Sequence, residues 1–171
     1  MKMFARYAPP ARRAIFFARA VTLYSAHDYI QPLDLLRGLI FEDNRAQTIF
    51  DLRDFFPIYR GLPLISADLH LNEKSGPPLD QASKQILRET AAEATGMGDY
   101  FIDTEHILVG ILRVPDCDAA GYLSMIGLTV LAAREQIERD NKQSRRDYGP
   151  TPLSWRINRR LSKLVPFSKT L

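Results

Sequence analysis

Residues Ile102 to Leu112 read Ile-Asp-Thr-Glu-His-Ile-Leu-Val-Gly-Ile-Leu and are the most informative segment for the fold. Asp103 or Thr104 can cap a helix here by accepting a hydrogen bond from a free backbone N–H. The apolar residues that follow recur at helical spacing and predict one buried face, made of Ile107, Leu108, Ile111 and Leu112. Gly110 costs about 1 kcal/mol relative to alanine inside a helix, so we expect a second helix to approach closely there.

A second copy of this pattern lies earlier in the chain. Residues 35–40 fall on residues 107–112, and Gly38 falls on Gly110. In the same register, residues 27–30 fall on 99–102 and residues 11–15 fall on 83–87. Three matching segments in one register indicate an internal repeat rather than a coincidence.

Residues typical of helix boundaries divide each half into separate helices. Prolines suit the first turn of a helix, and glycines or polar residues suit the ends and caps. We therefore expect helix starts at Pro9, Pro10 and Pro32, helix ends at Gly96, Gly98 and Gly127, and caps at Asn44, Asp118 and Thr129.

The chain is accordingly expected to be an all-α domain over residues 1–139, with repeats at about residues 3–56 and 79–139. Residues 57–78 are rich in proline and glycine and are interpreted as the connection between the halves. Residues 140–171 are interpreted as a separate basic tail.

Composition excludes several classes of protein. The 171 residues are 46% hydrophobic and 25% charged, which is typical of a globular domain and excludes a wholly disordered or fibrous chain. One cysteine cannot form an internal disulfide. No stretch approaches the ~18 apolar residues of a membrane span. The apolar run at residues 14–18 is too short for a signal peptide. We therefore expect a cytoplasmic protein.

The second half and the spacing of its motifs resemble the Clp N-terminal domain. The residues that carry the resemblance are Ser83, Lys84, Gln85, Ile86, Leu87, Ala91, Ala94, Gly98 and the string from Ile102 to Leu112. The first half resembles the other copy of the same double motif. The resemblance implies an all-α, pseudo-twofold bundle of two helical repeats. It also implies a module that binds adaptor proteins and substrates for Clp unfoldases and takes no cofactor.

Clp N-terminal domains usually precede AAA+ ATPase modules of the ClpA or ClpC type. This chain contains no Gly-x-x-x-x-Gly-Lys-Ser/Thr string that would cradle a nucleotide phosphate. The resemblance is therefore to a stand-alone Clp N-terminal domain, for which accessory subunits of plastid Clp proteases offer precedent. The expected partners are proteins or peptides, among them Clp ATPase or protease subunits and their adaptors.

The resemblance also suggests where a partner would bind. In ClpC-like members, glutamates of two Thr-Glu motifs help to bind phosphorylated arginine. Thr104 and Glu105 keep that pattern, whereas the equivalent first-half positions are Pro32 and Leu33, which cannot pair with a guanidinium. We expect Thr104, Glu105 and His106 to contribute to peptide or partner binding. A two-site phosphoarginine reader is disfavoured, and a one-site reader that uses Glu105 is the open alternative.

Catalytic and metal chemistry are not expected from this sequence. Glu105 and His106 have no nucleophile or second base at motif spacing, and there is no Gly-x-Ser-x-Gly string. A metal site needs three or four ligands, and Cys117, His27, His70 and His106 show no ligand spacing. We expect no catalytic residue and no metal ligand, and Cys117 is interpreted as a small apolar residue or a surface thiol.

The net positive charge of the chain comes entirely from the tail. Residues 140–171 hold eight Lys or Arg against two Asp, a net charge of +6, so residues 1–139 carry −3 of the total +3. A helix here would place Arg156, Arg159, Arg160 and Lys163 on one face and Ile157, Leu161, Leu164 and Val165 on the other. Such a helix suits an anionic membrane surface or nucleic acid. Docking on the domain and disorder are the alternatives.

Overall fold

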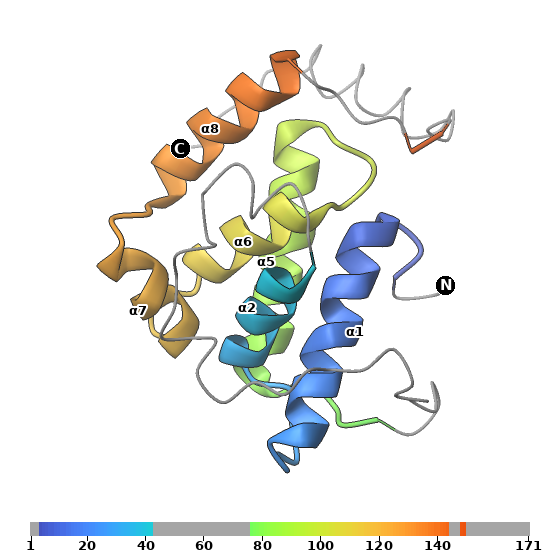
Figure 1. Cartoon of the computed structure of the whole chain (residues 1–171). Helices are drawn as coiled ribbons and strands as arrows, with labels where there is room; N and C mark the ends of the chain where they lie inside the picture. Colours follow the sequence, from blue (N-terminus) through green and yellow to red (C-terminus); the bar gives the residue numbers. More distant parts are fainter. Residues whose placement is uncertain (1–3, 43–75, 144–147, 150–171) are drawn as a thin grey trace, which may run out of the picture.

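The structure is a computed structural model that describes residues 4–42, 76–143 and 148–149 (Figure 1). These residues are all-α, as the sequence predicted. Their helices are α1 (Pro9–Tyr24), α2 (Pro32–Phe41), α5 (Gln81–Met97), α6 (Thr104–Leu112), α7 (Asp118–Met125) and α8 (Val130–Gln143).

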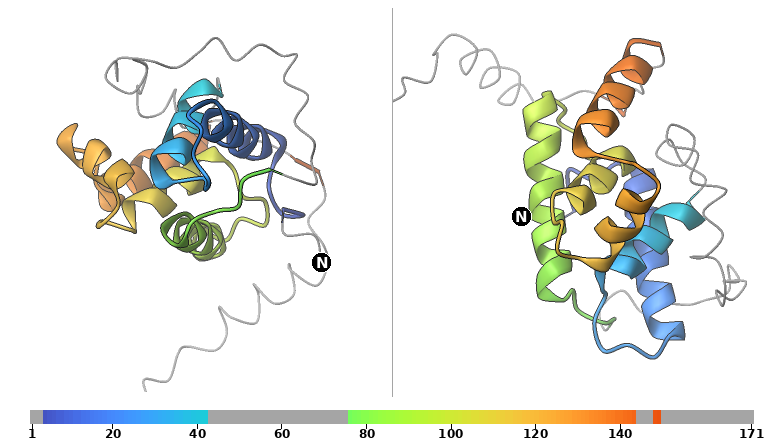
Figure 2. Two further views of the ribbon diagram at one scale, coloured as in Figure 1. Left: turned by 90° about the horizontal axis from the view of Figure 1, so that it is seen from below. Right: turned by 90° about the vertical axis from the view of Figure 1, so that its left-hand side faces the viewer.

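The two halves of the described chain repeat the same arrangement of a long helix followed by a short one. α1 packs on α2, and α5 packs on α6. The two pairs lie against each other, with α7 and α8 on the side away from α1 (Figures 1 and 2). The fold is therefore the pseudo-twofold bundle expected from the internal repeat.

Backbone hydrogen bonds join the two halves symmetrically. The segment before α1 bonds to the segment before α6: Ala8 N–H donates to Ile102 O at 2.8 Å, and Ile102 N–H donates to Arg6 O at 2.8 Å. At the equivalent place in the other repeat, Asp80 N–H donates to Ile30 O at 3.1 Å, and Ile30 N–H donates to Pro78 O at 2.8 Å. Because the repeat places Ile30 on Ile102, the register found in the sequence is also the register of the structure.

Glycine allows the helices of each pair to approach closely. A Cβ on Gly38 of α2 would lie 2.7 Å from Ala18 N, and a Cβ on Gly110 of α6 would lie 2.9 Å from Ile86 O. Both distances are shorter than a real Cβ permits, so no side chain fits at either position. The expected close approach at Gly110 is confirmed, and Gly38 has the same role in the first half.

The core is formed by the predicted apolar faces of both halves. Ile107, Leu108 and Ile111 are at most 1% exposed, and every residue of α6 is buried. The largest buried side chains of α2 are Leu35, Leu36 and Leu39. Each such buried side chain stabilises the folded state by about 1.5–3 kcal/mol. The short helices α2 and α6 thus form the centre of the domain.

Most helix boundaries follow the predicted signals, and two do not. Helices α1 and α2 begin at Pro9 and Pro32. The left-handed Gly98 (φ 79°) ends α5, but Gly96 lies within the helix rather than ending it. The cap of α7 is Cys117 rather than Asp118, because the Cys117 Sγ accepts the Ala120 N–H at 3.4 Å.

Other sequence predictions concern residues that the structure does not describe, or the boundary between the domain and the tail. The Asn44 cap, most of the 57–78 connection and the tail helix with Arg156, Arg159, Arg160 and Lys163 lie outside them. Helix α8 continues to Gln143, so the domain boundary expected at residue 139 falls inside a helix. Within the described part of the chain, no helix is both long enough and apolar enough to span a membrane.

Candidate functional site

The residues expected to bind a partner lie in the first turn of α6. Asp103 caps this helix, and its side chain accepts the Thr104 N–H at 2.8 Å. A carboxylate is favourable in the first turn because the helix N-terminus carries partial positive charge, and Glu105 lies there. Thr104, Glu105 and His106 are only 0%, 2% and 2% exposed. The structure thus brings the three residues together, but in the interior.

His106 fixes the local conformation through both ring nitrogens. Its Nδ1 accepts the Asp103 N–H at 3.0 Å, which completes a reciprocal cap, and its Nε2 lies 3.5 Å from Asp99 Oδ2. The tautomer with hydrogen on Nε2 fits both contacts. Burial acts to lower the pKa of His106, but the contact with Asp99 and the charges of Glu105, Asp99 and Asp103 raise it above its ordinary value of 6.5.

A residue from beyond α8 also contacts the beginning of α6. Tyr148 donates a hydrogen bond from its hydroxyl to Asp103 Oδ2, and its ring packs on Phe101 at 5.8 Å between centroids. Nothing in the sequence singled out Tyr148, because its hydrogen-bond partner is distant along the chain. A direct contact between the Thr104–Glu105–His106 turn and a partner stays a prediction.

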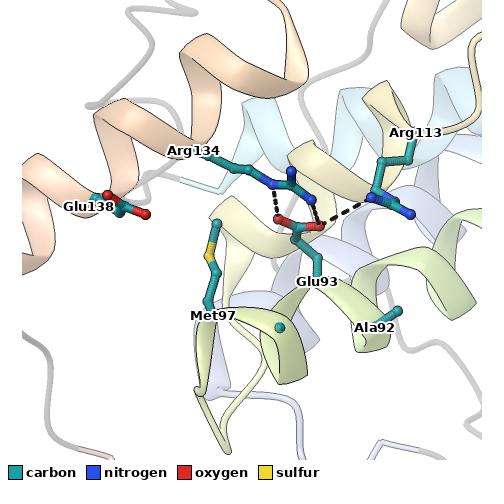
Figure 3. Close-up of a pocket in the computed structure, with 7 residues that line it drawn as sticks. Ala92, Glu93, Met97, Arg113, Arg134 and Glu138 are labelled. Atoms are coloured by element: carbon teal, nitrogen blue, oxygen red, sulfur yellow. Dashed lines mark hydrogen bonds and ion pairs between the residues drawn. The ribbon is translucent and has the colours of Figure 1, made fainter. Parts of the chain in front are cut away.

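A second candidate is a groove that sequence reasoning missed. It lies between α5, the C-terminal end of α6 and α8, and encloses about 330 Å³ (Figure 3). Its lining consists of Ala92, Glu93, Gly96, Met97, Arg113, Arg134 and Glu138. The residues come from three segments that are far apart in the sequence, so no local sequence motif could have predicted the groove.

A buried carboxylate lies at the centre of this groove. Glu93 has a side chain only 4% exposed and accepts two hydrogen bonds from Arg134, at 2.5 and 2.7 Å. Arg113 lies 3.6 Å from the same carboxylate and donates to Glu89 at 2.7 Å. Two guanidinium groups placed in this way compensate for the cost of removing the Glu93 carboxylate from water. The network also fastens α8 to α5.

Reactive and metal-binding side chains do not gather in the described residues. Among residues 4–42, 76–143 and 148–149, no three of the His, Cys, Asp and Glu side chains lie together as metal ligands would. Cys117 is partly buried and caps α7, and burial raises the pKa of its thiol. A raised thiol pKa disfavours the reactive thiolate.

Comparisons with known proteins agree with the repeat seen in the structure. Residues 66–126 match the family model of the Clp repeat (R) N-terminal domain. The negative regulator of genetic competence ClpC/MecB of Bacillus subtilis is 24% identical over 141 residues, which are 79% of this chain and 17% of that protein. An uncharacterised protein of Mycobacterium bovis is 27% identical over 116 residues, which are 67% of this chain and 46% of that protein.

A solved structure has the same fold. The N-terminal domain of the Caseinolytic protease associated chaperone ClpD from Arabidopsis thaliana superposes with a TM-score of 0.56 and 23% identity, over 79% of this chain and 96% of that chain. At this identity the likeness shows the fold. Residues 66–126 of this chain thus resemble the Clp repeat (R) N-terminal domain, and the comparison with ClpC/MecB extends the likeness over 79% of the chain.

Proposed function

We propose that the protein is a non-catalytic module that binds proteins or peptides and acts as an accessory or regulator of Clp ATP-dependent proteolysis. The observation that carries this proposal is the internal repeat, joined by equivalent backbone bonds at Ile30 and Ile102, whose second half matches the Clp repeat family model. Clp N-terminal domains generally bind substrates and adaptors. Recognition of such a protein is therefore the function that this fold supports best.

The names of the relatives point to the same machinery. They include a competence regulator of the ClpC type and ATP-binding subunits of Clp proteases. The chain spans only 17% of the length of these relatives. Their ATP-driven activity therefore does not transfer with the matched segment, and the part proposed for this protein is recognition alone.

Two surfaces are available for this role. The groove beside Glu93 is open to solvent and is lined by apolar residues and by side chains of both charges. The turn with Thr104, Glu105 and His106 is the second, and a partner would reach it only after displacement of the residues that bury it. The groove is the better candidate because it needs no rearrangement.

The proposal can be tested by affinity capture from the native organism. The full chain is immobilised, bound proteins are identified by mass spectrometry, and the same chain unfolded by heat serves as the control. We expect Clp ATPase or peptidase subunits, or their adaptors, to be enriched on the folded chain. Repeated capture of none of these proteins would remove the link to Clp proteolysis.

The charge of the tail favours a second candidate function. A segment with a net charge of +6 over residues 140–171 suits attachment to an anionic membrane surface or to nucleic acid. Binding to anionic vesicles or DNA should then weaken steeply with salt and disappear when residues 150–171 are deleted. Salt-independent behaviour of the full chain would exclude this function.

A further inference from the structure

We propose that the groove between α5, α6 and α8 binds the side chain of a lysine or arginine from a protein segment. The aliphatic stem would lie on α5, and the positive head would lie beside Glu138. This inference rests on the proposed function, because it names the chemistry of the segment that the module would recognise. Two properties of the groove support it, its shape and its charge, together with a difference in residue type between the two repeats.

The shape of the groove suits a long, unbranched side chain. Ala92, Gly96 and Met97 form its apolar part on α5. A Cβ added to Gly96 would meet no atom within 4 Å, so the space over this residue is open. A volume of about 330 Å³ is near the lower limit for ligand pockets. Lysine and arginine place their methylene groups on such surfaces and keep the charged head in water.

The charges of the groove favour a cation over an anion. Arg134 is paired with Glu93, and Arg113 is paired with Glu89. An incoming anion would lie near the buried Glu93 carboxylate, which already occupies the position between the two guanidiniums (Figure 3). Coulomb repulsion at short range opposes that arrangement.

Glu138 lines the groove but takes part in none of these ion pairs. It is exposed on α8, and within the described residues no ion pair joins it to a cation. Figure 3 places it at the end of the groove opposite Arg113, with its carboxylate directed toward Met97. A positive head group that extends past Met97 would therefore reach Glu138.

Within residues 4–42, the first repeat does not reproduce the lining of the groove. In the register of the repeat, the positions equivalent to Glu93, Gly96 and Arg113 hold Val21, Tyr24 and Phe41, which are apolar or aromatic. The ion-pair network joins α5 to the end of α6 and to α8, all within the second repeat. The fastening of α8 accounts for Glu93 and Arg134, but it accounts neither for the open space over Gly96 nor for Glu138.

The test uses the full chain labelled with nitrogen-15 and two probes. The probes are acetylated and amidated Ala-Ala-Lys-Ala-Ala and the same peptide with norleucine in place of lysine, each added to about 10 mM because a single side chain binds weakly. We expect the lysine peptide to move the amide signals of Gly96, Met97 and Glu138. The norleucine peptide should move them much less.

Matched variants separate this site from general attraction to acidic residues. Glu138→Gln should weaken binding of the lysine peptide about threefold or more, whereas Glu135→Gln, an exposed glutamate on the same helix that does not line the groove, should leave it unchanged. Gly96→Leu should abolish binding by filling the open space, while the α6 amide signals stay in place and report an intact fold.

Three results would overturn the proposal: no movement of the groove signals, equal movement with norleucine, or equal affinity of the Glu138→Gln variant and the parent chain. Each of these results leaves the capture of Clp subunits or adaptors unaffected. Failure of this site is therefore distinguishable from failure of the proposed function.

Discussion

His106, which is buried, contacts the partly exposed Asp99, and the residue types of this pair are exchanged in the other repeat. His106 Nε2 lies 3.5 Å from Asp99 Oδ2 in the second repeat. The equivalent positions of the first repeat hold Asp34 and His27, with His27 Nδ1 3.7 Å from Asp34 Oδ2. Both repeats thus place one imidazole and one carboxylate around the start of the short helix, in opposite order.

The two contacts should differ in their contribution to stability. Asp34 also accepts hydrogen bonds from Thr22 Oγ1 and Gln31 N–H, so it keeps partners without His27. His106 has a side chain only 3% exposed and would lose its carboxylate contact. Asp99→Ala should lower the free energy of unfolding by about 1–3 kcal/mol, and His27→Ala by less than about 1 kcal/mol. Urea unfolding of both variants measures this, and equal losses would contradict the asymmetry.

The packing glycines should not tolerate alanine. Gly38→Ala places a Cβ against the backbone of Ala14 and Ala18, which cannot move without separating α1 from α2. We expect this variant to lose about 1–3 kcal/mol in free energy of unfolding. The control is Gly121→Ala in α7, where an added Cβ meets no atom within 4 Å. Because alanine has the higher helix propensity, this variant should gain about 0.5–1 kcal/mol in free energy of unfolding. Thermal unfolding midpoints that move in the same direction would refute this account of the helix pairs.

The predicted apolar face of α6 should supply much of the stability. Leu108 and Ile111 are both 0% exposed. Leu108→Ala and Ile111→Ala should each cost about 2–5 kcal/mol through lost burial and a residual cavity. The measurement is the midpoint of denaturant unfolding. The dependence of the free energy of unfolding on denaturant concentration should stay the same as in the parent chain. A loss below about 1 kcal/mol in either variant would show that the face is not core.

Tyr7 should make the protein sensitive to alkali. Its burial raises the pKa of the phenol to about 12, against a small opposing effect of the Arg6 charge. Because the folded pKa lies above the ordinary value of 10, the contribution of Tyr7 is complete below pH 10 and is lost as the pH rises toward 12. The loss should approach roughly 2–3 kcal/mol, the equivalent of about two pKa units.

Tyr7→Phe provides the comparison for this effect. The variant keeps the aromatic ring and removes the titrating group. Its free energy of unfolding should fall less than that of the parent chain between pH 10 and 12. Identical alkaline profiles would mean that the phenol ionises as readily in the folded chain as in the unfolded chain.

The sequence predicted the features that depend on local spacing and on the repeat. The apolar face of α6, the close approach at Gly110, the proline starts and the glycine end of α5 are all confirmed. Each is a property of residues close together along one helix or of equivalent positions in the two repeats. Such patterns follow from helix geometry and need no knowledge of tertiary structure.

The candidate site could be predicted only in part, because its geometry depends on distant residues. The Glu93–Arg134 pair and the Tyr148–Asp103 contact each join positions that no local motif connects. The burial of Glu105 likewise depends on what packs over the first turn of α6. The Cys117 cap was missed for a different reason: aspartate is the stronger capping residue, and the backbone places the helix start one residue earlier.

We propose that this protein recognises a Clp subunit or adaptor through the groove between α5, α6 and α8. Photo-cross-linking from position 92, in the groove on α5, tests it most directly, with position 124 on α7 as the control. A photoreactive residue replaces Ala92 or Ser124, and adducts formed in native extract are identified by mass spectrometry. We predict adducts with a Clp subunit or adaptor from position 92 and not from position 124. Adducts of equal yield from both positions, or none with a Clp protein, would contradict the account.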